Sequence, residues 1–348
     1  MNNELLTYSQ QDLSALMKDW GQPAFRGKQV YEWLHKRHVR TYNEMTNVPQ
    51  KVRDLLSERF PLQQLRIANK QVSRDGSRKY LLELPDGLLV ETVGLPHFDD
   101  TGAIERLSVC VSSQVGCPMA CSFCATGREG LSRNLKAGEI VEQVVTVQND
   151  FSHRVSNVVV MGQGEPFLNY REVLTALKML NSADDLNIGA RHITLSTCGI
   201  LQGIEQLSLE PEQFTLAVSL HSAVQETRDL LMPKVASQPL FELKKALASY
   251  IAATKRRVSL EYLLLDGIND DERHLQALRS FCKGLLVHVN LLPMNKVDDS
   301  PLQPSSSRTA KYWIDALNKD GIETTMRVSR GSDISGACGQ LKNSLLKS

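Results

Sequence analysis

The feature that most constrains the fold is an alternation of strand-like and helix-like segments that begins near residue 106. Apolar runs suited to strands fall at 107–112, 157–161, 192–196, 214–220, 258–265, 286–292 and 322–328. Helical periodicity falls between them, near 137–149, 169–181, 201–208, 240–254, 270–283 and 306–319. Repeated strand–helix units imply a parallel sheet with helices on its outer face. Six units are fewer than the eight of a closed barrel, so we expect an α/β fold with a partial (β/α)6 TIM-like barrel over residues 103–348.

Two smaller segments precede this barrel. Residues 1–64 predict a helical accessory domain, because a helix start at Ser9 is followed by helical patterns over 27–38 and 49–60. Residues 65–102 predict a β-hairpin and linker, with turn signals at 75–76 and 85–87. We expect the linker itself at 96–102.

Composition excludes several classes of protein. The 348 residues carry a formal net charge of only +1, so a nucleic-acid surface would have to be a local patch. No run of eighteen apolar residues and no signal-peptide pattern is present, so we expect no membrane partner. Seven cysteines, three of them in one loop, suit a reducing compartment better than a disulfide framework. The cytoplasm is the expected location.

The loop containing Cys117, Cys121 and Cys124 carries the strongest chemical signal. Its spacing lets three thiols face a single object, and thiolates are soft ligands for iron–sulfur clusters or zinc. The next cysteine is Cys198, too distant in the sequence to complete a local four-ligand site. A cluster held by three cysteines leaves one iron able to bind a substrate. Zinc binding and three unliganded buried thiols are the alternatives.

Other polar residues fall at or beyond the carboxyl ends of the predicted strands. A Gly-Gln-Gly-Glu-Pro turn with Gly164 and Glu165 follows the second strand, Ser196 ends the third, Ser219 ends the fourth, and Asn295 follows the sixth. Barrel-like α/β proteins build their sites at this edge. The arrangement therefore predicts one shared pocket, although each residue taken alone is more often a satisfied polar group.

The sequence pattern alone assigns no role to one carboxylate and four cysteines. Glu91 lies within an apolar strand-like run, and we expect its carboxylate to face solvent. Buried structural thiols are the simplest interpretation of Cys198 and Cys282, and an open alternative for Cys110 and Cys338.

The cysteine loop, with Phe123 before its third cysteine, resembles the cluster loop of radical S-adenosylmethionine (SAM) enzymes. A larger set of motifs resembles the RlmN/Cfr family of rRNA adenine methyltransferases, closest to its dual-specificity, C2-methylating RlmN branch. These motifs span nearly the whole chain and lie at 24–28, 90–92, 110–127, 133–135, 162–166, 195–197, 219–221, 290–295 and 337–341.

The resemblance implies a set of roles. Cys117, Cys121 and Cys124 would hold one [4Fe-4S] cluster, and two SAM molecules would be used per turnover. Cys338 would carry the S-methylcysteine intermediate, Cys110 would form a transient disulfide with Cys338, and Glu91 would be the proton acceptor, against the solvent-facing expectation above. The implied SAM contacts are Gly164, Glu165, Ser196, Ser219, Leu220, His221 and Asn295.

The implied substrates are 23S rRNA, methylated at adenine C2 in the peptidyl transferase centre, and the tRNA adenosine 3′ of the anticodon. The implied partners also include an external one-electron donor, with the protein acting as a monomer. The alternatives are a C8-specific, Cfr-like resistance enzyme and a non-catalytic Fe–S RNA-binding protein. Basic residues expected to contact RNA lie in the first helical unit and beside the cysteine loop, at Arg26, Lys28, Lys36, Arg37, His38, Arg40, Arg128, Arg133 and Lys136.

The chain departs from the family pattern at two places. Gln163 stands where the family usually has Met, and Ser335-Gly336 precede Ala337-Cys338 where the family usually has Asp-Ala. Because glycine adds backbone freedom, we expect Gly336 to loosen the loop that carries Cys338.

Overall fold

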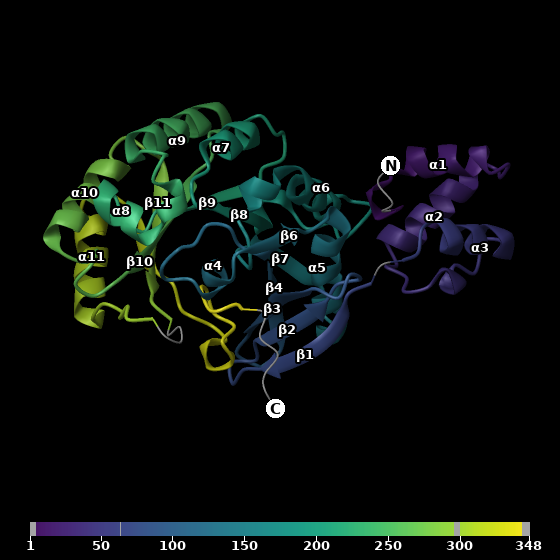
Figure 1. The fold of residues 1–348 in the computed structure, drawn as a ribbon, viewed down its shortest axis with the longest axis horizontal. Coiled ribbons are helices and arrows are strands. Elements are labelled where there is room, and N and C mark those ends of the chain that lie inside the picture. Colours follow the sequence, from purple (N-terminus) through teal and green to yellow (C-terminus); the bar gives the residue numbers. More distant parts are fainter. Residues whose placement is uncertain (1–4, 63, 296–299, 343–348) are drawn as a thin grey trace.

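The computed structural model describes residues 5–62, 64–295 and 300–342. Three α-helices form a small unit near the N-terminus, at the right of Figure 1: α1 (Gln10–Asp19), α2 (Phe25–His35) and α3 (Gln50–Arg59). Ser9 caps α1 as the sequence predicted, since its hydroxyl accepts from the Asp12 N–H at 3.1 Å and the Asp12 carboxylate accepts from the Ser9 N–H at 2.9 Å. The three helices enclose an apolar core of their own.

Ten strands form one continuous sheet that carries the rest of the molecule. Its first three strands are antiparallel: β1 (Arg66–Val72), β2 (Arg78–Glu83) and β3 (Leu89–Phe98). Seven further strands run parallel to one another: β4 (Ile104–Val111), β7 (Val155–Val160), β8 (Ile193–Thr197), β9 (Thr215–Ser219), β10 (Val258–Leu264), β11 (Val287–Pro293) and β12 (Thr324–Met326). Within the described residues β1 and β12 do not pair with each other, so the barrel is open, as predicted.

Helices cover the outer face of the parallel strands (Figure 1). Six of them match the predicted helices: α5 (Ala137–Phe151), α6 (Tyr170–Asn181), α7 (Leu201–Ser208), α9 (Leu240–Thr254), α10 (Glu272–Cys282) and α11 (Ser307–Lys319). The sequence did not predict α4 (Ala125–Glu129) and α8 (Gln225–Leu231), because elements this short show too little periodicity. A separate two-stranded sheet, β5 (Gln114–Gly116) with β6 (Leu131–Asn134), frames the cysteine loop.

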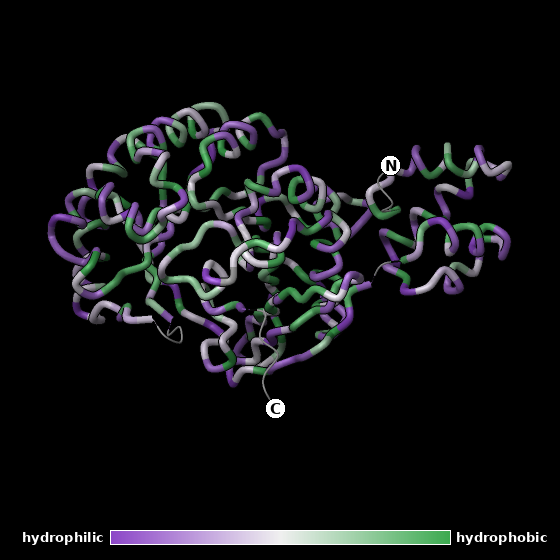
Figure 2. The backbone as a smooth tube through the Cα atoms, viewed as in Figure 1, coloured by the Kyte–Doolittle hydropathy of each residue, from purple (hydrophilic) through white to green (hydrophobic). Residues whose placement is uncertain are grey.

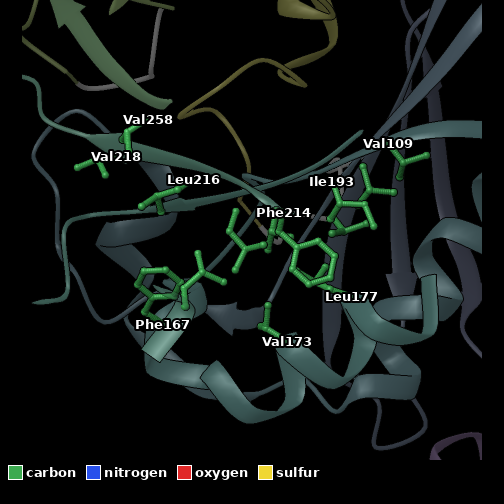
Figure 3. Close-up of a cluster of buried hydrophobic side chains, with 14 of the residues drawn as sticks. Val109, Phe167, Val173, Leu177, Ile193, Phe214, Leu216, Val218 and Val258 are labelled. Atoms are coloured by element: carbon green, nitrogen blue, oxygen red, sulfur yellow. The ribbon is translucent and has the colours of Figure 1, made fainter. Parts of the chain in front are cut away.

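Packing between helices and sheet makes the main core. Val109 on β4, Val173 and Leu177 on α6, Ile193 on β8, and Phe214 just before β9 belong to this core (Figure 3). Figure 2 shows the matching distribution, with hydrophobic residues along the central strands and hydrophilic residues on the outer turns. None of the helices in the described part of the chain is long and apolar enough to cross a membrane.

The linker predicted at 96–102 is wrong for its first three residues. β3 extends to Phe98 and pairs with β4, so only the turn after it connects the antiparallel and parallel parts of the sheet. Pro96 is tolerated because, although proline lacks an N–H, its carbonyl remains available, and it accepts a hydrogen bond from the Arg330 guanidinium.

Candidate active site

Two connected cavities lie inside the partial barrel. The first, which we call the cysteine chamber, has a volume of about 160 Å³ and lies at the carboxyl ends of the parallel strands. The second, which we call the arginine chamber, has a volume of about 460 Å³ and extends along the inner face of β4, β7 and β8. The predicted single pocket at the strand ends is therefore present, with a second space beside it.

Cys117, Cys121 and Cys124 all line the cysteine chamber. Their loop is fixed by backbone hydrogen bonds, including Cys117 N–H to the Gly130 carbonyl at 2.8 Å and Cys124 N–H to the Cys121 carbonyl at 3.1 Å. Burial raises the pKa of Cys117 to about 12 and also raises the pKa of Cys124. Such thiols are protonated in an apolar chamber, and a bound cation would favour the thiolate instead.

A small metal ion is a poor fit to these thiols. In the described part of the chain, no group of three or more His, Cys, Asp or Glu side chains is placed to hold a metal ion. Zinc needs its ligands close around one point. The three thiols nevertheless face one chamber, an arrangement suited to a larger multi-iron group.

Cys198 is a site residue that our pattern analysis missed. Its thiol is hydrogen-bonded with that of Cys121, and it lines the same chamber. The hydrogen bond and burial together raise the pKa of Cys198 well above its ordinary value. The signal was available, because Cys198 follows Ser196 at the carboxyl end of β8, the edge that supplied the other candidates.

The Gly-Gln-Gly-Glu turn after β7 requires its second glycine. Gly164 has φ +108°, and a Cβ there would lie 2.5 Å from the Ser113 hydroxyl. The turn aims Glu165 into the chamber, where its carboxylate accepts from the Phe167 N–H at 3.0 Å and the Cys198 N–H at 2.6 Å. Burial raises the pKa of Glu165. A buried carboxylate of this kind is a candidate partner for a cationic ligand group.

Ser196, Ser219, His221 and Asn295 also line the cysteine chamber, as predicted for a shared pocket. Burial lowers the pKa of His221 to about 3, so its imidazole is neutral, and its Nδ1 accepts from the Leu263 N–H at 3.0 Å. Its ring meets Phe123 edge-on, with 4.6 Å between the ring centroids.

Leu220 does not line the chamber. Its side chain belongs to the hydrophobic core, and the backbone N–H groups of Leu220 and His221 both donate to the Glu261 carbonyl, at 3.0 and 3.2 Å.

Cys338 stands between the two chambers and lines both, while Cys110 lines the arginine chamber from β4. Cys338 is exposed to the cavity, but the cavity itself is surrounded by protein. This surrounding protein raises the pKa of the Cys338 thiol. Burial raises the pKa of Cys110 to about 12, and the neighbouring Cys338 adds a smaller effect. The positive charge of Arg327 opposes the rise in pKa at both Cys110 and Cys338. The fold thus brings together two thiols from opposite ends of the barrel sequence.

Hydrogen bonds fasten the loop that carries Cys338. The Gly339 carbonyl accepts from the Ala125 N–H at 2.8 Å, the Leu341 carbonyl accepts from the Thr126 hydroxyl at 2.6 Å, and the Cys338 carbonyl accepts from Asn295 at 3.1 Å. Gly336 itself donates to the Gly331 carbonyl at 2.8 Å. The loop predicted to be loosened by Gly336 is therefore tied to α4, directly after the cysteine loop.

Glu91 is buried, with 1% of its surface exposed, so the expectation of a solvent-facing carboxylate is wrong. It lies two residues along β3 from Val93, which pairs with Cys110, so Glu91 and Cys110 share one face of the sheet. Its carboxylate pairs with Lys79 at 3.2 Å and accepts from the Lys342 N–H at 2.8 Å. Glu91 is not among the residues that line either chamber.

Gln163, which stands where the family usually has methionine, forms a hydrogen bond with β3 at Glu91. Its side-chain oxygen accepts from the Glu91 N–H at 3.3 Å, and its own N–H donates to the Ser112 hydroxyl at 2.9 Å. The amide thus links the turn after β7 to β3, a bond that a methionine side chain cannot make.

Several basic residues expected to contact RNA have partners within the protein. Two of them, Lys36 and His38, face Asp184 and Asp185 beyond α6, and so does the neighbouring His35. His35 Nδ1 lies 2.8 Å from Asp185, and Lys36 lies 3.0 Å from Asp184. These contacts dock the helical unit on the barrel. Two further arginines are also engaged: Arg40 lies 3.5 Å from Glu142, and Arg133 pairs with Asp86 and Glu139.

Comparison with known proteins gives a consistent result. Residues 111–278 match the Radical SAM superfamily, and residues 3–62 match the Ribosomal RNA large subunit methyltransferase N-terminal domain. A probable dual-specificity RNA methyltransferase RlmN from Microcystis aeruginosa is 44% identical over 98% of this chain and 99% of the relative. One from Clostridium novyi is 41% identical over 95% and 96%. The crystal structure of a radical SAM methyltransferase from Sphaerobacter thermophilus superposes with a TM-score of 0.91, at 38% identity and over 98% of this chain and 99% of that one.

Proposed function

This chain belongs to the RlmN family of radical SAM RNA methyltransferases, and on that premise we propose that it methylates adenine C2 in 23S rRNA and in the tRNA adenosine 3′ of the anticodon. The observation that carries this proposal is the position of Cys338. It stands between a chamber lined by three loop cysteines and a chamber that contains Cys110. A methyl carrier between a cofactor and a substrate needs such a position.

Members of the radical SAM superfamily use SAM and an iron–sulfur cluster. We place one [4Fe-4S] cluster on Cys117, Cys121 and Cys124, and SAM against Gly164, Glu165, Ser196, Ser219, His221 and Asn295. Leu220, whose side chain lies in the core, would contact SAM through its backbone. Together the bound groups would supply a methyl group and a hydrogen-abstracting radical, with two SAM molecules used per turnover. The protein's own residues bind and orient these groups and exclude water from the chamber.

Three side chains of the protein would carry out the remaining steps: Cys338, Cys110 and Glu91. Adenine C2 is an electron-poor carbon without a nucleophilic lone pair, so direct displacement on a sulfonium is not open to it. Cys338 would carry the methyl carbon to C2 as S-methylcysteine. Glu91, whose carboxylate also accepts from the Lys342 N–H, would take the C2 proton. The Cys110 thiolate would then attack the Cys338 sulfur, forming a disulfide and breaking the sulfur–carbon bond, whose electron pair stays with the carbon on the base. That carbon would take up a proton and so become the methyl group.

The product of the reaction tests the proposal. The reconstituted protein, SAM, a one-electron donor and an rRNA fragment should give 2-methyladenosine in digested RNA analysed by mass spectrometry. Cys338→Ala should abolish it, Cys110→Ala should trap a covalent RNA–protein adduct, and Cys282→Ala, a core thiol far from the chambers, should retain it. Formation of 8-methyladenosine alone would establish the C8-specific alternative. Absence of any methylated adenosine with the wild-type protein, together with RNA binding that Cys338→Ala leaves unchanged, would establish the non-catalytic one.

The proposed substrates indicate the location and the partners of the protein. Acting on ribosomal and transfer RNA, the protein would work in the cytoplasm as a monomer with an external electron donor. Its target base has to leave the stack to reach Cys338, so loops and partly unfolded RNA are the suitable substrates.

A further inference from the structure

The arginine chamber is lined by basic side chains without matching acidic ones, and the proposed reaction assigns no role to these basic residues. Its lining contains four arginines and two histidines and no aspartate or glutamate: Arg106, Arg191, Arg327, Arg330, His97 and His192. Arg327 lies 3.6 Å from Glu261 of the cysteine chamber. Within the described residues, Arg106, Arg191 and Arg330 form no ion pair with a carboxylate.

The cations gather at one end of the chamber. Arg106 Nη2 lies 2.9 Å from His97 Nε2, and the Arg330 guanidinium donates to the Pro96 carbonyl beside it. Burial lowers the pKa of His97, and Arg330 and Arg106 lower it further against a smaller opposing effect of Glu105. Arg106 and Arg330 both act on His97, so these two positive charges share one partly enclosed region, and a bound anion would relieve their repulsion.

The strand geometry separates this end from the thiols. Arg106 and Cys110 are four residues apart on β4 and point to the same side, about 13 Å apart at 3.3 Å per residue. The reaction site at Cys110 and Cys338 therefore occupies one end of the chamber, and the unpaired cations occupy the other. Ser108 and its partner on β7, Asn157, line the wall between them with uncharged hydrogen-bonding groups.

We propose that Arg106 and Arg330, with His97 between them, form a phosphate subsite that grips the RNA backbone next to the target adenosine while its base reaches Cys338. Guanidinium groups suit this task because they bind phosphate oxygens through paired, charge-assisted N–H donors. The subsite rests on the proposed RNA methyltransferase function and adds to it a positioning contact that carries no sequence information. Because a phosphate contact does not depend on base sequence, it would admit both rRNA and tRNA.

Binding measurements on the reconstituted full-length protein test the subsite. The probe is an anticodon stem-loop RNA, either native or with one neutral methylphosphonate at a linkage flanking the target adenosine. Arg106→Gln and Arg330→Gln should each weaken binding of the native RNA about tenfold and lower the slope of log K against log salt by about 1. The matched control Lys245→Gln removes a charge from the exposed face of α9 and should change neither quantity.

The decisive readout is non-additivity. At one of the flanking linkages the methylphosphonate should weaken wild-type binding about as much as Arg106→Gln does, and should add nothing to the loss in that variant. Arg106→Lys should restore part of the affinity. SAM-dependent methylation of Cys338 without RNA, measured by mass spectrometry, should remain intact in every arginine variant and so exclude misfolding.

Two results would overturn the subsite. One is wild-type binding by Arg106→Gln and Arg330→Gln, and the other is full additivity with the methylphosphonate at both flanking linkages. These outcomes are distinct from failure of the proposed function, which would show as absence of 2-methyladenosine with the wild-type protein itself.

Discussion

Five cysteines line the cysteine chamber: three from the loop, Cys338 from the C-terminal segment, and Cys198. Cys198 comes from the end of β8 and is hydrogen-bonded with Cys121. Two interpretations follow: either Cys198 is a neighbour of the metal site, or it is a fourth ligand. The loop spacing favours the first, because three thiols leave one iron free for SAM.

Iron content distinguishes these interpretations. After anaerobic reconstitution, Cys121→Ala should lose most of its iron, because a cluster site deprived of one of three thiolate ligands binds poorly. Cys198→Ala should keep the full complement of the wild-type protein. Iron and sulfide assays with absorption spectra provide the measurement. Equal loss of iron in both variants would make Cys198 a ligand.

At the scale of elements, α5 is where the N-terminal helical unit meets the barrel. Glu142 lies on this helix with 15% of its side chain exposed, and burial raises its pKa to about 7 in spite of Arg40 at 3.5 Å. A carboxyl whose pKa is higher in the folded state favours folding while it is protonated. Its contribution is complete below the unfolded pKa near 4.5 and is lost as the pH rises to about 7.

Replacing this carboxyl should therefore flatten the dependence of stability on pH. Between pH 5 and pH 8 the wild-type protein should lose up to about 2.5 kcal/mol of unfolding free energy relative to Glu142→Gln, which is most of the free energy that the pKa shift represents. Urea unfolding at the two pH values provides the measurement. Glu205→Gln, on the exposed side of α7, should follow the wild type. Parallel profiles for wild type and Glu142→Gln would contradict the assignment.

At the scale of the whole molecule, the C-terminal segment completes the site by packing against the start of the barrel sequence. The residues after Cys338 bond to α4, which follows the cysteine loop, although more than two hundred residues separate them in sequence. The Lys342 N–H continues this contact to Glu91 on β3. Both ends of the barrel sequence therefore hold Cys338 near Cys110.

Removing one of these ties should loosen the closing segment. Thr126→Val keeps the side-chain volume but leaves the Leu341 carbonyl without its hydroxyl donor, at a cost of about 1 kcal/mol. Amide hydrogen exchange over residues 337–342 should become about fivefold faster, and RNA methylation should slow while iron content stays unchanged. Thr175→Val, which breaks a local bond on α6, should leave this segment as in the wild type. Unchanged exchange in Thr126→Val would show that the tie does not hold the loop.

The sequence by itself determined the features that depend on neighbours along the chain. The strand–helix alternation, the Ser9 cap, the glycine turns and the cysteine loop are all local patterns, since each rests on periodicity or on a few adjacent residues. The family motifs added the roles of Cys110, Cys338 and Glu91 as expectations. The short α4 and α8 lay below what periodicity can resolve.

Only the tertiary structure decided what depends on residues far apart. Glu91 is buried because the C-terminal segment and Lys79 cover it, and no pattern within β3 carries that information. Cys198 joins the chamber because β8 lies inside the sheet. The basic face around His35 docks on the barrel because Asp184 and Asp185 lie opposite. The arginine chamber exists because an open sheet brings Arg106 and Arg330 together, and burial and charge balance are properties of such assembled surroundings.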